Sequence, residues 1–169
     1  ISNVDAGLAA SLELKPHHRS LGIITSDCDD VTYVALDEAT KAADVEVVYA
    51  RSMYAGAGNA STKLAGEVIG ILAGPNPEEV RSGLDVAVYE IENGASFYSA
   101  NDDDSIPYFA HCISRAGSYL SEGANAEEGT AIAYLFAPPG EAMVALDAAL
   151  KAADVQVGAF YGCLLYTSD

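Results

Sequence analysis

The sequence predicts a protein of the mixed α/β class, α+β in detail, that contains one small structural unit twice. Residues 34–48 read VALDEATKAADVEVV and residues 144–158 read VALDAALKAADVQVG, so 11 of the 15 positions are identical at an offset of 110. A short apolar run precedes each copy, and alternating β-branched residues follow it. Because the polar positions match as well as the alanines, the likeness indicates a duplicated unit rather than shared composition.

The centre of each copy predicts a helix that packs against a sheet. Apolar residues recur at i, i+3, i+6 and i+7, which places them on one helical face, and alanine lets that face approach a sheet closely. We expect the opposite face of both helices to be solvated, with acid–base pairs at i, i+4: Asp37 with Lys41, and Asp147 with Lys151. The two apolar faces consist of Leu36, Ala39, Ala42 and Ala43, and of Leu146, Ala149, Ala152 and Ala153.

The other elements of the first unit follow in order along the chain. Strands are predicted over residues 21–25, 45–49 and 67–73, from apolar runs bounded by turn residues. A second helix begins after Asn76, a good N-cap, has Pro77 at its first position, and ends before Gly94. The order strand, helix, strand, strand, helix predicts a ferredoxin-like α/β sandwich with both helices on one face of the sheet.

The second unit is predicted to be the same sandwich in incomplete form. Its strands are expected over residues 131–136 and 155–160, on either side of the repeated helix. Only 14 residues follow Val155, whereas the first copy continues through a further strand and helix. We therefore expect a chain truncated at both ends, with domains at residues 1–104 and 105–169. The tail 163–169 extends no earlier pattern, and we expect it to be non-native.

The composition argues against several functional classes. The chain has 169 residues, with 8 Lys and Arg against 25 Asp and Glu, for a formal net charge of −17. Such a chain repels phosphate backbones and anionic lipid headgroups, so neither nucleic acid nor a membrane is an expected partner. No apolar run reaches the roughly 18 residues that span a bilayer. Three separated cysteines without a C-x-x-C pair predict reduced thiols rather than a disulfide framework.

Longer motifs of the chain resemble one protein family, the shell proteins of bacterial microcompartments, which are built from BMC domains. The resemblance is specific for the tandem-domain shell proteins of ethanolamine-utilisation compartments, and it runs from Ile1 to about Phe160. It implies two tandem, circularly permuted BMC domains. The matching stretches are KPHHRSLGIITSDCDDVTYVALDEATKAADVEVVYARSMYAGAG, AGEVIGILAGPNPEEVRSGLD, IENGASF and HCISRAGSYL.

The resemblance implies a structural function without catalysis. Proteins of this type form homotrimers that act as pseudohexagonal tiles, pack beside other shell proteins, and enclose a microcompartment in the bacterial cytoplasm. A gated central pore passes metabolites, and the small-residue segment 54–66 resembles the pore-lining loop of the family. This segment lacks the G-x-x-x-x-G-K-[ST] spacing of a phosphate loop, which we therefore reject.

The resemblance also implies a ligand. Ethanolamine binds between subunits in this family and favours the closed pore, and the matching contacts are Asp29, Asp30, Glu67 and Phe97. Carboxylates suit an ammonium group through charge-assisted hydrogen bonds, and an aromatic face also attracts a cation. The family further implies zinc near the pore, with His111 and Glu141 as candidates. Because structural zinc takes four ligands, two candidates make a poor site, and we expect no other cofactor.

Each candidate has a plainer interpretation, and the chain has alternative functions. The segment with Asp29 and Asp30 reads as a solvated turn, Phe97 as a core residue, and His17 with His18 as a surface pair. A second hypothesis is a small-molecule-binding regulatory module with a ferredoxin-like fold. A third is an acid/base isomerase that uses Asp29 and Glu67. Assembly into flat sheets separates the shell tile from the regulatory module, which stops at a closed small oligomer.

Overall fold

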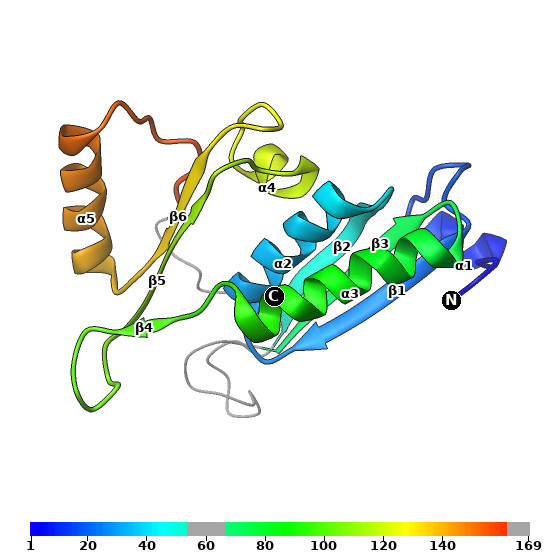
Figure 1. The fold of residues 1–169 in the computed structure, drawn as a ribbon, viewed down its shortest axis with the longest axis horizontal. Helices are drawn as coiled ribbons and strands as arrows, with labels where there is room; N and C mark the ends of the chain where they lie inside the picture. Colours follow the sequence, from blue (N-terminus) through cyan, green and yellow to red (C-terminus); the bar gives the residue numbers. More distant parts are fainter. Residues whose placement is uncertain (54–66, 162–169) are drawn as a thin grey trace.

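The computed structural model describes residues 1–53 and 67–161, with Glu67 described by its backbone alone. The first unit contains β1 (Ser20–Ser26), α2 (Asp29–Ala42), β2 (Glu46–Met53), β3 (Glu67–Gly74) and α3 (Pro77–Asn93). Its antiparallel sheet has the order β1-β3-β2, and α2 and α3 cover one face of it (Figure 1). This arrangement confirms the ferredoxin-like sandwich that the repeat predicts.

The alanine-rich face of α2 lies against this sheet as predicted, except at Ala42, which is exposed. Leu36 and Ala39 are fully buried, together with Leu72 of β3, in a core between the helices and the sheet. Gly70 of β3 allows the close approach, because a Cβ atom at that position would lie 2.7 Å from Leu36 Cδ1. The second helix also begins as predicted, since the Asn76 side chain accepts a hydrogen bond of 2.9 Å from the backbone N–H of Glu79.

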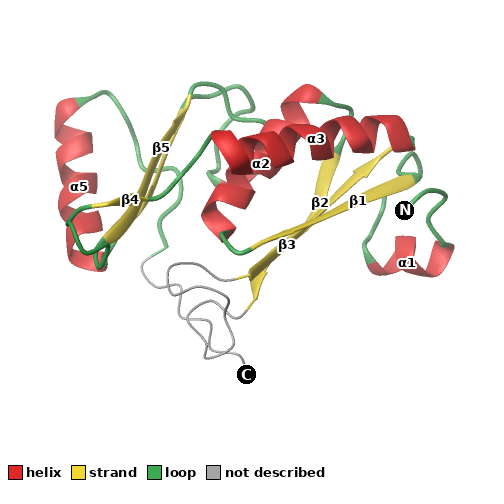
Figure 2. Cartoon of the chain, turned by 60° about the horizontal axis from the view of Figure 1, so that its bottom comes forward, coloured by secondary structure: helices red, strands yellow, loops and turns green. Residues whose placement is uncertain are grey.

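The other face of the first sheet is covered by the N-terminal segment. Helix α1 (Ala6–Ser11) lies on this side, opposite α2 and α3 (Figure 2). Leu21 and Ile71 form a small core there with Val4, Leu12 and Leu14, the residues that flank α1. The side of α1 that faces away from the sheet stays in contact with solvent, and no residue of the helix is buried.

The second unit contains β4 (Tyr98–Ser99), β5 (Pro107–Ile113), α4 (Ser118–Gly123), β6 (Ile132–Phe136) and α5 (Pro139–Ala152). Its sheet has the order β4-β5-β6. The predicted strand over residues 131–136 is thus confirmed as β6, and the repeated helix as α5. The predicted domain boundary after residue 104 falls in the turn between β4 and β5, and it stays a prediction.

Two expectations for the second unit are wrong. Residues 155–160 form no strand, and the apolar face of α5 is not packed, since α5 has no buried residue. In the first unit the equivalent strand β2 takes its ladder partner from β3. Among the residues that the structure describes, none after Ala152 forms a strand that could pair in this way. Without a partner strand, the backbone N–H and C=O groups of this segment can hydrogen-bond only to water, so the segment stays irregular.

Helices α1 and α5 lie at opposite ends of the molecule, with the two sheets between them (Figures 1 and 2). Within the described ranges 1–53 and 67–161, no helix combines the length and the apolar character needed to cross a bilayer.

Candidate functional site

The junction between the two units is built around Phe109 of β5. This side chain is fully buried, and its ring centroid lies 5.3 Å from those of both Phe97 and Tyr134. Val31 and Val34 of α2 close the cluster from the first unit. Helix α2 therefore contributes to two apolar cores, one with the first sheet and one with β5 and β6 of the second.

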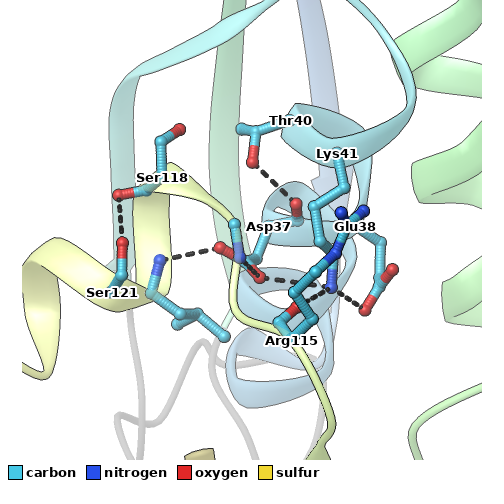
Figure 3. Close-up of polar contacts among 9 residues, drawn as sticks. Asp37, Glu38, Thr40, Lys41, Arg115, Ser118 and Ser121 are labelled. Atoms are coloured by element: carbon cyan, nitrogen blue, oxygen red, sulfur yellow. Dashed lines mark hydrogen bonds and ion pairs between the residues drawn. The ribbon is translucent and has the colours of Figure 1, made fainter. Parts of the chain in front are cut away.

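A buried carboxylate on α2 binds the backbone of the second unit. Asp37 is fully buried, and its two side-chain oxygens accept hydrogen bonds from the backbone N–H groups of Gly117 (2.7 Å) and Leu120 (2.8 Å) (Figure 3). These groups stand at the N-cap and the third position of α4. Asp37 thus caps a helix of the other unit, where the positive end of the helix dipole favours an anion. The expectation that Asp37 lies on a solvated face is wrong, because α4 covers it.

Lys41 neutralises this buried charge. Its Nζ lies 3.5 Å from Asp37 Oδ2, donates a hydrogen bond of 3.0 Å to the carbonyl oxygen of Arg115, and also donates to Glu38 (Figure 3). Only 12% of the Lys41 side chain is exposed. The expectation that Lys41 is solvated is therefore wrong as well. A buried carboxylate that is both hydrogen-bonded and ion-paired avoids the cost of an isolated charge.

Gly117 is required by the close approach of α4 to α2. A Cβ atom there would lie 2.3 Å from Thr40 Oγ1 and 2.7 Å from the carbonyl oxygen of Asp37. Real Cβ atoms do not approach other atoms that closely, so a larger residue would separate the two helices. Sequence reasoning missed both Gly117 and the buried role of Asp37. The repeat does not indicate which aspartate is buried, since Asp37 and Asp147 both follow Val-Ala-Leu and both precede a lysine by four positions.

The second copy of the acid–base pair is exposed, as expected. The Lys151 Nζ and the Asp147 Oδ2 are 2.5 Å apart, with 74% and 62% of the respective side chains exposed. The two pairs share their sequence spacing but differ in burial. The reason is tertiary: α4 lies on α2, and within the described part of this chain no element lies on α5 in the same way.

Asp29 and Asp30 stand at the first turn of α2. Asp30 is buried and accepts a hydrogen bond from the Tyr134 hydroxyl of β6, which is a second polar contact between the units. Burial raises the pKa of Asp30 to about 6, although the Tyr134 hydrogen bond partly opposes this shift. Burial, together with the Asp30 charge, also raises the pKa of Tyr134, so the phenol stays protonated and donates. Asp29 is half-buried, and its Oδ1 accepts from the backbone N–H of Asp30 at 3.0 Å.

The other two predicted ethanolamine contacts are Glu67 at the start of β3 and Phe97 directly before β4. Glu67 begins β3 opposite Met53, and the next residue pairs with Ser26 at the end of β1, so the backbone of Glu67 lies at the sheet end from which the chain enters α2. Phe97 is half-buried in the junction core, with its ring 6.0 Å from that of Phe136. The structure places Phe97 in the aromatic cluster that contains the Asp30 partner, Tyr134, whereas Asp29 and Asp30 are simply consecutive in the sequence.

The zinc candidates do not form a metal site within the chain. His111 pairs with Tyr134 across the β5–β6 ladder, and Glu141 is exposed in the first turn of α5. Over residues 1–53 and 67–161, neither belongs to a group of three or more side chains that could bind one ion. Two ligands do not satisfy the four-coordinate preference of zinc. The zinc assignment therefore stays a prediction.

A different group, His17, His18 and Glu46, does converge, but its hydrogen bonds oppose metal binding. His18 is buried, so the expected surface pair is wrong for this residue. Its Nδ1 accepts from the backbone N–H of Lys15 at 3.3 Å, which leaves the ring proton on Nε2, 3.5 Å from Glu46 Oε1. The other Glu46 oxygen, Oε2, already forms an ion pair with Lys15 Nζ at 2.5 Å. Burial also lowers the pKa of His18, so the ring is neutral and acts as a structural contact.

Comparison with known proteins agrees with this geometry. Residues 20–101 match the family model described as BMC domain. The bacterial microcompartment shell protein EutL of Clostridium perfringens (strain 13 / Type A) is 71% identical over 161 residues, covering 95% of this chain and 74% of that protein. EutL of Escherichia coli (strain K12) is 56% identical over 160 residues, covering 95% and 73%. The crystal structure of ethanolamine utilization protein EutL from Leptotrichia buccalis C-1013-b has a TM-score of 0.89 and 67% identity, covering 96% of this chain and 75% of that chain.

The chain belongs to the family of bacterial microcompartment shell proteins, which confirms the predicted α/β fold class and the tandem BMC architecture. Within that family its likeness is to EutL. These relatives are named as shell proteins and not as enzymes, and the place of a shell protein is the wall of a microcompartment.

Replacing Asp37 by Asn is expected to lower the free energy of unfolding by about 2 kcal/mol, because the amide offers one acceptor where two N–H donors and an ammonium converge. Urea unfolding followed by circular dichroism measures the change. Asp85→Asn, on an exposed position of α3, is the control with the same loss of charge and should change stability by less than about 0.5 kcal/mol. Equal stability of the two variants would show that the junction does not depend on the carboxylate.

Asp30 is expected to make stability fall as pH rises from about 4 to about 6. Its pKa is higher in the folded state than in the unfolded chain, so the native protein binds more protons in this window and loses relative stability as protons leave. The loss should reach about 1 to 3 kcal/mol. Urea unfolding at a series of pH values measures it for the wild type and for Asp30→Asn, which retains an acceptor for Tyr134. The variant should show a flatter dependence, and parallel curves for the two proteins would contradict the assignment.

Proposed function

We propose that this chain is a facet tile of an ethanolamine-utilisation microcompartment and that three copies form a pseudohexagonal trimer with a gated central pore. The observation that carries the proposal is the α2–α4 junction. Asp37, Lys41 and the Phe109 core hold the two BMC units side by side in one fixed orientation, which we call a plate, whereas a flexible linker would leave them free to move. A fixed plate with two related units is the geometry that three copies need to approximate a six-sided tile.

The pore itself is proposed from the family resemblance. The segment 54–66, predicted to line it, lies outside the described residues. A pore that closes when ethanolamine binds would couple permeability to the amount of substrate. The charge of the chain supports passage or storage of small cations near the tile, since a net charge of −17 raises their local concentration.

The proposed ethanolamine site comprises Asp29, Asp30, Glu67 and Phe97, the residues that match the family contacts. Asp29 is a suitable carboxylate for an ammonium, because it is half-buried and, within residues 1–53 and 67–161, its Oδ1 accepts a hydrogen bond from the backbone N–H of Asp30 and from no other group. The Asp30 carboxylate already accepts a hydrogen bond from the Tyr134 hydroxyl, which fixes the position of the turn. In this site Asp30 would also add negative charge near the ammonium. Phe97 offers a partly exposed aromatic edge of the junction core.

The partners in this proposal are two further copies of the chain and other shell proteins with BMC domains. The alternative, a regulatory module with the same fold, predicts a different end state, because such a module stops at a closed small oligomer. The two hypotheses therefore separate by assembly rather than by ligand binding, which both allow.

Concentrated protein is expected to form flat sheets with hexagonal order, because tiles that meet edge to edge extend in two dimensions. Negative-stain electron microscopy and sedimentation velocity check this together. Trimers that associate further into sheets support the tile. A discrete small oligomer that forms no sheet at any concentration would favour the regulatory module instead.

Asp29→Ala is expected to weaken ethanolamine binding by roughly tenfold, since the variant loses a charge-assisted hydrogen bond to the ammonium. Isothermal titration calorimetry with ethanolamine measures the affinity, and ethylene glycol, which lacks the ammonium, should not bind. Asp85→Ala removes an exposed carboxylate elsewhere and serves as the matched control. Unchanged affinity in Asp29→Ala would remove this residue from the site.

A further inference from the structure

Tyr134 of β6 is the residue through which the second unit reaches the proposed ethanolamine site. Its hydroxyl donates a hydrogen bond to Asp30 Oδ1 on α2, across 104 residues of sequence. Its ring centroid lies 5.3 Å from that of Phe109, and the Phe97 ring packs on the same Phe109 ring, also at 5.3 Å. Tyr134 therefore contacts one of the proposed ligand residues directly and shares a ring neighbour with a second.

The hydrogen bond orients the Asp30 carboxylate. Asp30 is only 5% exposed, and Tyr134 bonds to its Oδ1, so Oδ2 is the oxygen better able to accept a hydrogen bond from a cation. The backbone N–H of Asp30 donates to Asp29 Oδ1 at 3.0 Å, which ties the two acidic residues together in the first turn of α2. A cation that reaches this turn meets two consecutive carboxylates, one of which is oriented from the other unit.

The same hydrogen bond favours the ionised form of Asp30. Burial and the neighbouring Asp29 charge raise the pKa of Asp30 to about 6, and the Tyr134 hydroxyl acts in the opposite direction. A phenol that donates to a carboxylate stabilises the anion, whereas a protonated carboxyl group has no charge with which to attract an ammonium. Without the hydroxyl, the pKa of Asp30 would therefore rise further, toward neutral pH.

We propose that Tyr134 is a positioning residue for the proposed ethanolamine site and holds Asp30 there as an oriented anion. The inference rests on the proposed function and adds that the site depends on the second unit as well as on the first. Tyr134 reaches Asp30 because β6 packs against Val31 and Val34 of α2. Ethanolamine affinity is thereby coupled to the docking of the two units.

Other titratable groups lie near this pair: Asp29 and Tyr33 on α2, Cys28 just before it, and His111 on β5. Asp29 adds negative charge, which raises the pKa of Asp30. Burial raises the pKa of the Cys28 thiol to about 11, so the thiol stays neutral. His111 pairs with Tyr134 across the β5–β6 ladder, and histidine is the residue type that ordinarily gains charge near pH 6 to 7. The test therefore includes a variant of His111.

The test measures ethanolamine affinity of the wild type and Tyr134→Phe by isothermal titration calorimetry between about pH 5 and about pH 8.5, where an alkyl ammonium keeps its proton. Wild-type affinity should fall as pH decreases through about 6, because Asp30 takes up a proton. In Tyr134→Phe this fall should move up by about 1 to 2 pH units, the effect of losing one hydrogen bond to a charged group. Affinity near neutral pH should then drop by roughly three- to tenfold, and it should return to within about twofold of the wild type at the alkaline end.

Three further variants serve as controls, and thermal melts by circular dichroism check that each is folded. Tyr89→Phe removes a hydroxyl from an exposed position of α3 and should change neither affinity nor its pH dependence. His111→Gln should leave the wild-type midpoint in place. Asp30→Asn should abolish the pH dependence, and adding Tyr134→Phe to it should cause little further loss, because the two residues act as one pair.

An equal loss of affinity at every pH in Tyr134→Phe would indicate a merely structural role and overturn the inference, as would unchanged affinity. In either case the proposed site would stand if Asp29→Ala still weakened binding. Should Tyr134→Phe not fold, the same pH dependence in the wild type and in Asp30→Asn would overturn the inference. A wild type that binds no ethanolamine at any pH would contradict the proposed site itself, so the two failures are distinguishable.

Discussion

The burial of one carboxylate, that of Asp37, determines how the two halves of this molecule are joined. A charge removed from water must be compensated where it lies, and here the compensation comes from two N–H groups at the start of α4 and from the Lys41 ammonium. The two N–H groups require α4 to sit on α2 in one position, which Gly117 makes sterically possible. The interaction is directional, unlike the apolar contacts around Phe109, and it therefore specifies an orientation as well as a contact.

Helix α2 consequently serves both units. Its apolar face packs on the first sheet, Asp30 at its first turn holds Tyr134 of the second sheet, and Asp37 further along holds α4. A helix held by the second unit at two points along its length transmits the position of one unit to the other. This explains how a chain made of two small sandwiches can behave as one plate, which is the property that a wall requires.

The duplicated helix α5 shows the same chemistry without its partner. Asp147 and Lys151 form a solvated pair, and such exposed pairs contribute little to stability. The same residue types thus act as a structural centre in one copy and as surface groups in the other. The difference lies in what covers them.

The repeat, the position of most of the apolar face of α2 and the capping of α3 could be predicted from the sequence, because they depend on neighbours a few residues apart. The candidate site could be predicted only in part: Asp29 and Asp30 were assigned by resemblance, but the Tyr134 contact that buries Asp30 spans 104 residues of sequence and leaves no local signal. The same holds for Asp37 and Gly117, whose contact joins positions 80 residues apart. The amino-acid order by itself determined the local elements and their duplication. The tertiary structure alone decided which copy of the acid–base pair is buried, because burial depends on the approach of a distant helix.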